Sequence, residues 1–139
     1  MLILDPDDPK HVEATRRLRE ETIIWLTTVT PGGQPQSTPV WFLWDGSEFS
    51  IYGSASGPKT RNIERNPQVS LHLDGNGRGG AIVIFEGTAR VDADGPRADA
   101  APAFLDKYRS IMGQRWTPAS FADEYPHLIL VVPTRARIW

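Results

Sequence analysis

The feature that most constrains the fold is a series of short runs of β-branched and aromatic residues, separated by glycine- and proline-containing turns, in a chain of 139 residues. Such runs are typical of strands, and tight turns between consecutive runs favour antiparallel pairing. Asp45-Gly46 is a strong hairpin signal, and Gly87 inside a run indicates a bulge where a sheet bends. The predicted strands are residues 22–29, 34–44, 48–52, 68–73, 81–92, 127–133 and 136–139.

Besides residues 54–67, which are described below, helical patterns lie in three places. An Asp-Pro pair can cap and begin a helix over residues 8–21, and a Gly-Pro pair opens another over residues 95–112. Residues 115–125 form a connector with a short helix. Many strands with few helices predict a β-rich α+β fold, a small closed barrel. A chain of this length has room for one core, so we expect a single domain over residues 1–139, with an N-terminal helix in 1–21 and a barrel with inserted helices in 22–139.

Composition excludes several classes of function. A formal net charge of −2 gives no broad footprint for nucleic acid or a membrane surface. The chain has no cysteine, so it has no disulfide framework, thiol nucleophile or thiolate metal site. Its histidines, His11, His72 and His127, show no metal-ligand spacing, so no metal is expected. Neither a signal-peptide pattern nor a long apolar run is present, and we expect a cytoplasmic protein.

Residues 54–67 predict an anion site at the start of a short helix. A Ser-Gly-Pro sequence can cap and begin this helix, and an Asn-Pro pair ends it. Its first turn carries Lys59 and Arg61, although the N-terminal end of a helix disfavours cations. A phosphate would satisfy the free N–H groups, the hydroxyls of Ser54 and Ser56 and both cations together. Solvated cations explain the pattern equally well, and both side chains are expected to be exposed in the free protein.

The same region resembles a known family. The resemblance is to the flavin/deazaflavin oxidoreductase superfamily, which includes the pyridoxamine 5'-phosphate oxidases and their relatives that use coenzyme F420. It covers residues 20–139 and implies a split β-barrel with short flanking helices. The residues that carry it are Tyr52-x-Ser54, Lys59-x-Arg61-Asn62-Ile63-x-x-Asn66-Pro67-x-Val69-x-Leu71, the segment 33–42 and Glu86-Gly87-x-Ala89-x-Val91.

The resemblance also implies where a cofactor binds. In the family, the strand that matches residues 34–44 lies against the isoalloxazine or deazaflavin ring. From the pattern alone, Pro39 marks a sheet edge or bulge, and Trp41 is better explained as a core residue. The ring-side candidates are Thr38, Pro39, Val40 and Trp41, and the phosphate-side candidates are Ser54, Ser56, Lys59, Arg61 and Asn62.

No residue stands out as a general acid or base, which fits an enzyme whose cofactor carries the hydride. The Lys-x-Arg-Asn pattern and the short chain are similar to the F420-using branch. The resemblance therefore implies an F420-dependent oxidoreductase that acts on a small conjugated substrate, with an FMN-dependent oxidoreductase as the alternative. A non-catalytic protein that binds flavin, deazaflavin or haem is a third interpretation, in which His72 and His127 are the candidate axial ligands.

We expect a homodimer, because a ring-binding cleft on so small a barrel needs a second wall. The family resemblance points the same way. Tryptophans on the predicted strands could build an apolar interface between two copies of the chain. The interface candidates are Trp25, Trp41 and Trp44; Trp116, Tyr125 and Trp139 could line the pocket from the second subunit, although packing within their own chain is the simpler interpretation.

Overall fold

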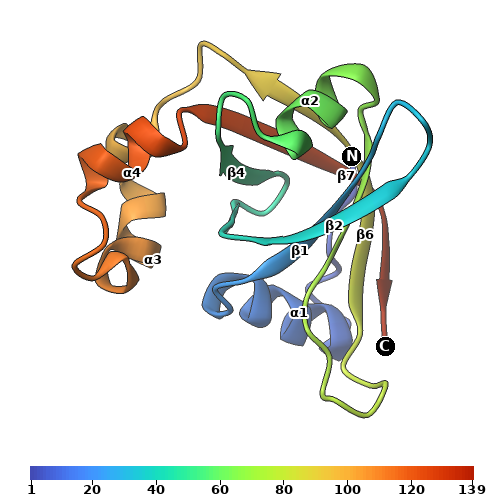
Figure 1. The fold of residues 1–139 in the computed structure, drawn as a ribbon. Helices are drawn as coiled ribbons and strands as arrows, with labels where there is room; N and C mark the ends of the chain where they lie inside the picture. Colours follow the sequence, from blue (N-terminus) through green and yellow to red (C-terminus); the bar gives the residue numbers. More distant parts are fainter.

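One antiparallel sheet curls into half of a barrel. In the computed structural model, which describes residues 1–139, seven strands lie in the order β2-β1-β5-β6-β7-β4-β3 (Figure 1). The outer strands β2 and β3 do not pair with each other, so the sheet stays open within one chain. This confirms the split β-barrel and corrects the closed barrel that the strand pattern alone predicts. The strands are β1 (Ile24–Val29), β2 (Pro35–Val40), β3 (Leu43–Trp44), β4 (Phe49–Gly53), β5 (Gln68–His72), β6 (Val83–Asp92) and β7 (His127–Ile138).

The strand predicted at residues 34–44 is interrupted where the chain crosses from one edge of the sheet to the other. β2 pairs with β1, whereas β3 pairs with β4 at the opposite edge. Between them, the backbone N–H of Phe42 donates to the hydroxyl of Tyr108 at 2.7 Å. The Tyr108 hydroxyl thus satisfies the backbone N–H of Phe42 in place of a neighbouring strand, and β2 can end at Val40. Pro39 lies in an outermost strand, which confirms its predicted edge position.

Short helices surround the sheet. Asp8 caps α1 by accepting a hydrogen bond from the backbone N–H of Lys10 at 2.9 Å. The helix predicted over residues 95–112 divides into a 3-10 turn and α3, because Pro102 keeps the preceding Ala101 in an extended conformation. None of the helices has the length and apolar character needed to cross a membrane. The helices are α1 (Pro9–Glu20), α2 (Pro58–Arg65), η1 (Ala98–Ala100), α3 (Pro102–Met112) and α4 (Pro118–Glu124).

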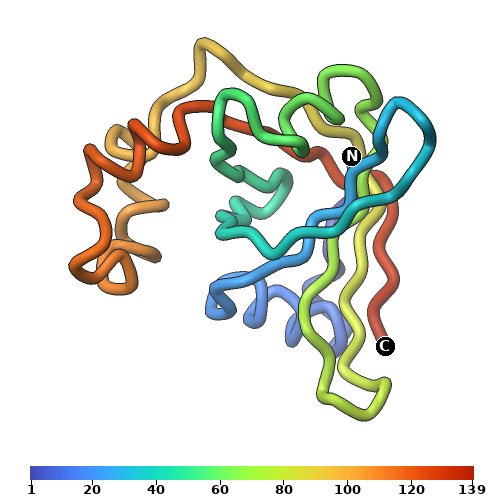
Figure 2. The backbone as a smooth tube through the Cα atoms, viewed as in Figure 1, coloured from blue at the N-terminus to red at the C-terminus, as the bar shows by residue number.

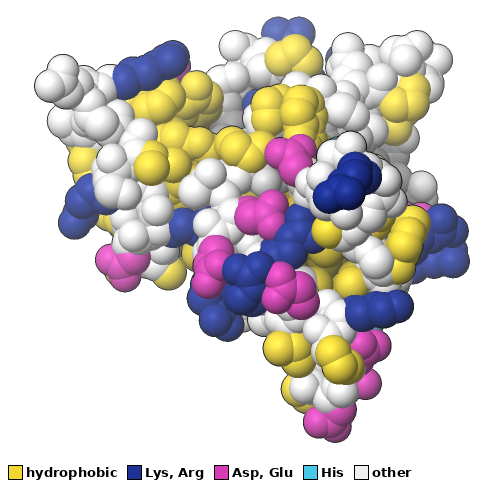
Figure 3. Space-filling model, turned by 90° about the horizontal axis from the view of Figure 1, so that it is seen from below, with side chains coloured by type: hydrophobic (Ala, Val, Ile, Leu, Met, Phe, Trp, Pro, Cys, Tyr) yellow, Lys and Arg dark blue, Asp and Glu magenta, His cyan; other side chains and the backbone are white.

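The face that carries α1 mixes acidic and basic side chains. Figure 3 shows lysine and arginine interleaved with aspartate and glutamate there. On α1, Arg16 pairs with Glu13 and Glu20, and Arg17 pairs with Glu21. Charges of one sign therefore do not gather on this face.

Residues 98–124 form a helical lobe, made of η1, α3 and α4, that lies beside the sheet (Figure 2). Two groups of buried apolar residues follow from this arrangement. The barrel core fills the concave side of the sheet and includes Phe49, Ile51 and Phe85. The aromatic cluster joins the helical lobe to the sheet and includes Tyr52, Phe104, Tyr108, Phe121 and Leu128.

A bulge in β6 shapes the long β6–β7 pair, as the sequence predicts. The pairing register shifts between Glu86 and Gly87. A Cβ atom on Gly87 would lie 2.6 Å from the carbonyl oxygen of Val132, so only glycine allows this close approach of the two strands.

Candidate functional site

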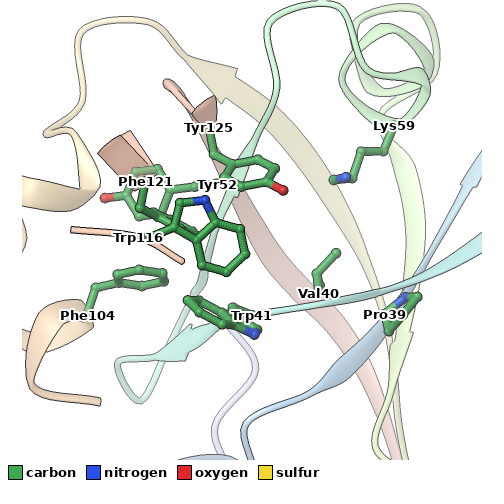
Figure 4. Close-up of a pocket in the computed structure, with 9 residues that line it drawn as sticks. All are labelled: Pro39, Val40, Trp41, Tyr52, Lys59, Phe104, Trp116, Phe121 and Tyr125. Atoms are coloured by element: carbon green, nitrogen blue, oxygen red, sulfur yellow. The ribbon is translucent and has the colours of Figure 1, made fainter. Parts of the chain in front are cut away.

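A pocket opens beside the chain crossing, between α2 and the helical lobe. Its volume is about 200 Å³. Figure 4 shows aromatic rings gathered at one end of the pocket and the amino group of Lys59 at the other. The lining residues are Pro39, Val40, Trp41, Tyr52, Lys59, Phe104, Trp116, Phe121 and Tyr125.

Trp41 is the centre of the aromatic end. Its ring stacks on Tyr108 with centroids 4.7 Å apart and on Phe121 with centroids 5.2 Å apart, both at an interplanar angle of 9°. The edge of Trp116 meets it at 5.6 Å. Trp41 is therefore both a packing residue and a pocket residue, because it is half-buried and its remaining surface lines the pocket.

Trp116 is held in place from outside the pocket. Its indole N–H donates to Glu124 at 2.6 Å, and the guanidinium of Arg115 lies 4.3 Å from its ring centroid. Trp116 and Tyr125 line the pocket from the same chain, as expected of residues that pack locally. Trp139, the third residue considered for this role, is 56% exposed and does not line the pocket.

Lys59 is the charged residue of the pocket. Its amino group points from α2 toward the hydroxyl of Tyr125 (Figure 4). The side chain is half-buried and no acidic group pairs with it, which corrects the expectation that it is exposed. Burial lowers the pKa of Lys59, because desolvation disfavours the ammonium form. An anionic ligand would relieve this cost.

The start of α2 offers further donors beside Lys59. The first intrahelical hydrogen bond runs from Arg61 N–H to the Gly57 carbonyl at 3.2 Å, so the backbone N–H groups of Lys59 and Thr60 precede it. The hydroxyl of Ser54 lies against this turn, and a Cβ on Gly57 would be 2.5 Å from its oxygen. Glycine at the cap thus lets Ser54 and the free N–H groups share one small region, which can bind an anion.

Like Ser54, the remaining phosphate-side candidates do not line the pocket. Ser56 and Arg61 are exposed. Asn62 is buried and its side-chain amide donates to Thr28 Oγ1 at 2.9 Å and to Gln36 Oε1 at 3.0 Å. Asn62 therefore links α2 to β1 and β2 by hydrogen bonds, and so helps to position the helix beside the pocket.

The ring-side candidates lie together on β2 and the crossing that follows it. Pro39, Val40 and Trp41 all line the pocket, whereas Thr38 lies one residue earlier in the strand. The hydroxyl of Thr38 is buried without a hydrogen-bond partner, which is costly for a polar group. Thr38 and Val40 share one face of β2, since strand side chains alternate. An unpaired hydroxyl next to the pocket fits a ligand with a polar edge.

The two candidate axial histidines do not form a common site. His72 lies on β5 and stacks on Trp25 with centroids 6.3 Å apart. His127 begins β7 opposite Gly53, and its Nδ1 is buried without a partner. Along their strands, His72 alternates with the core residue Leu71, whereas His127 shares the face of the core residue Ile129, so they occupy opposite faces of the sheet. Histidine, cysteine and carboxylate side chains nowhere gather in a group of three that could hold a metal.

The sequence did not point to Phe104 and Phe121 as pocket residues. Phe104 and Phe121 lie far from β2 in the sequence, and only the fold brings them against Trp41. The available signal was the density of aromatic residues between positions 104 and 125, which ordinary packing also explains.

Comparison with known proteins places this fold and pocket in context. A solved F420 reductase is 26% identical, with a TM-score of 0.66 over 88% of this chain and 94% of that one. A conserved hypothetical protein from Mycobacterium tuberculosis is 25% identical, with a TM-score of 0.72 over 92% of this chain and 82% of that one. The haem storage protein HutZ from Vibrio cholerae is 18% identical, with a TM-score of 0.63 over 99% and 95% of the two chains, and so shares the fold.

Comparison of the sequence with protein families gives a direct match. Residues 11–139, nearly the whole chain, match the pyridoxamine 5'-phosphate oxidase family. The curled seven-stranded sheet and the similar solved structures agree with this match. The chain therefore belongs to the pyridoxamine 5'-phosphate oxidase family.

Proposed function

We propose that this protein is an F420-dependent oxidoreductase that transfers a hydride between the deazaflavin coenzyme and a small conjugated substrate. The observation that carries the proposal is a half-buried lysine without a counterion at one end of an aromatic pocket. A coenzyme with a flat ring and an anionic tail satisfies both ends of such a pocket. The similarity to a solved F420 reductase supports the same assignment.

The residues present fit this group. Lys59, the hydroxyl of Ser54 and the free N–H groups at the start of α2 would hold the anionic part. Pro39 and Val40 would lie against the ring, and the buried hydroxyl of Thr38 would gain a partner at its polar edge. When bound, the deazaflavin supplies two-electron hydride chemistry. The protein orients the ring and uses its aromatic residues to exclude water from the open ring face.

Charge favours F420 over FMN in this pocket. The terminal phosphate of FMN is a phosphomonoester, which carries a charge of about −1.5 to −2 at neutral pH, whereas the phosphodiester of F420 carries a single negative charge. Lys59 is the one cation that lines the pocket, since Arg61 is exposed. One ammonium group matches a phosphodiester better than a phosphomonoester.

We further propose that a second copy of the chain completes the site. Pockets that bind drug-sized ligands span about 300–1,000 Å³. The volume of about 200 Å³ within one chain is smaller than this range. A homodimer would add the missing wall.

Titration of the purified protein with F420 and with FMN tests the cofactor. We expect saturable quenching of F420 fluorescence, with FMN bound at least tenfold more weakly. A flavin spectrum in the protein as purified would favour the FMN-dependent alternative, and a Soret band after addition of haem would favour the haem-binding one. Light scattering of the F420 complex at micromolar concentration tests the dimer, and a monomer would contradict it.

A further inference from the structure

The three tyrosines of the chain differ in what their hydroxyl groups contact. Tyr52 donates to the backbone carbonyl of Pro96 at 2.9 Å, away from the pocket. The hydroxyl of Tyr108 lies 2.9 Å from the carbonyl oxygens of both Thr22 and Phe42, so the backbone also occupies it. The hydroxyl of Tyr125 bonds to no backbone group. Its neighbour is the carboxylate of Glu124, and Figure 4 shows it pointing across the pocket in the direction of Lys59.

We propose that Tyr125 is the proton donor that completes substrate reduction in this pocket. The proposal rests on the proposed function and adds a general acid to it. It commits the substrate to a class, namely planar molecules in which a carbon–carbon double bond is conjugated to a carbonyl group. Tyr125 is distinguished from Tyr52 by the direction of its hydroxyl, although both rings line the pocket.

The surroundings of Tyr125 suit an acid that must stay protonated until it is used. Burial and the neighbouring Glu124 carboxylate raise the pKa of this phenol, and the nearby Arg115 opposes that rise. The phenol therefore carries its proton at neutral pH. Among the neighbouring charges, the guanidinium of Arg115 favours the ionised phenol, so it would stabilise the tyrosinate that remains after proton transfer.

The reaction balances without a further reactant. A hydride from the reduced deazaflavin is added to the β-carbon of the substrate, and the π electrons of the carbon–carbon bond move toward the carbonyl oxygen. The O–H bond of Tyr125 breaks as its proton passes to that oxygen, which gives an enol that returns to the ketone in water. The substrate gains two electrons and the coenzyme loses two. Water returns a proton to the tyrosinate.

A single substitution, which removes only the hydroxyl of Tyr125, tests the proposal kinetically. General acids contribute about 10²–10⁴-fold to a rate. We expect Tyr125→Phe to slow the oxidation of reduced F420 by 2-cyclohexenone at least about 100-fold. The dissociation constant for F420 should change less than threefold in the same variant, because the phenol is not assigned to cofactor binding. A rate in Tyr125→Phe within threefold of the parent would overturn the proposal.

A second measurement does not depend on activity. Infrared difference spectra of the cofactor-free protein with carbonyl-labelled 2-cyclohexenone report hydrogen bonding to the carbonyl group. The stretching band should shift to lower frequency in the parent and in Tyr52→Phe, and should return toward its free value in Tyr125→Phe. An unshifted band in the parent, or a shift that survives in Tyr125→Phe, would overturn the donor role. Failure of the parent to bind F420 would instead remove the proposed function and leave this spectroscopic result to decide on Tyr125.

Discussion

The barrel core and the aromatic cluster are both buried and apolar, but they are built differently. In the barrel core, alternate residues of paired strands meet across one concave surface, as Ile51, Phe85 and Ile129 do. In the aromatic cluster, rings from distant segments meet, and hydroxyl groups among them bond to backbone. The pocket lies beside the second, and Tyr52, Phe104 and Phe121 of the aromatic cluster line it. We therefore expect the barrel core to provide most of the stability and the aromatic cluster to contribute most to binding.

The largest expected effect tests the stabilising role of the barrel core. Phe85 is 1% exposed and packs against Phe49 with centroids 5.2 Å apart. Phe85→Ala should lower the free energy of unfolding by about 3–5 kcal/mol, because it removes buried area and leaves a cavity. Urea denaturation followed by circular dichroism measures this loss. Trp116→Ala is the control, since this half-buried ring in the pocket should cost less than half as much. Similar losses in both variants would contradict the division of roles.

The next prediction concerns the charge in the pocket. Lys59→Met should weaken F420 binding by about 1.5–3 kcal/mol, the range for hydrogen bonds to charged groups. The free protein should be no less stable, because a half-buried ammonium without a counterion is removed. Fluorescence titration and thermal unfolding measure the two quantities. Arg61→Met is the matched control on the same turn, and equal losses of affinity would show that the exposed Arg61 shares the anion site.

The hydroxyl of Tyr108 joins the helical lobe to the chain crossing. Tyr108→Phe should lower the free energy of unfolding by about 1–3 kcal/mol, because the buried N–H of Phe42 loses its partner. Tyr52→Phe removes a single bond to the Pro96 carbonyl and should cost about 0.5–1.5 kcal/mol. Urea denaturation of both variants compares them. A smaller loss in Tyr108→Phe than in Tyr52→Phe would show that the crossing does not depend on this hydroxyl.

The smallest expected effect is a dependence of binding on pH. Burial lowers the pKa of Lys59 in the free protein, and only the protonated amine attracts an anion. Affinity for F420 should therefore be highest at neutral pH, where Lys59 is protonated. It should decrease as pH rises through this lowered pKa, before the ordinary lysine value of 10.5 is reached. Lys59→Arg keeps its charge across this range, so its affinity should stay constant. Fluorescence titrations from pH 7 to pH 10 compare the two proteins, and parallel curves would exclude Lys59 as the titrating group.

The same contrast explains what could be predicted from the sequence. Strands, turns and the Gly87 bulge depend on local patterns, and the sequence predicts them well. The chain crossing at Trp41 and Phe42 could not be predicted, since it depends on the hydroxyl of Tyr108, which lies 66 positions from Phe42. The family resemblance placed Lys59 and Val40 near a common ligand, and both line the pocket.

Other site residues required the structure. Asn62 belongs to the Lys-x-Arg-Asn motif, yet its side-chain amide donates hydrogen bonds to Thr28 on β1 and Gln36 on β2. A motif shows that a residue type is needed at a position without showing what it contacts. Lys59 is half-buried in a pocket that it shares with residues of β2, β4 and the helical lobe, and no pattern in residues 54–67 encodes these neighbours.

The helical lobe is joined to the sheet by two short stretches of chain, residues 93–97 after β6 and residues 125–126 before β7. The first stretch follows β6 and the second precedes β7, and these two strands pair with each other, so both ends of the lobe are attached to adjacent strands of the sheet. One contiguous segment of the chain therefore supplies Phe104, Trp116 and Phe121 to the pocket. A change of sequence between the two attachment points would remodel the aromatic end of the pocket, while Pro39 and Val40 on β2 and Lys59 on α2 would stay in place.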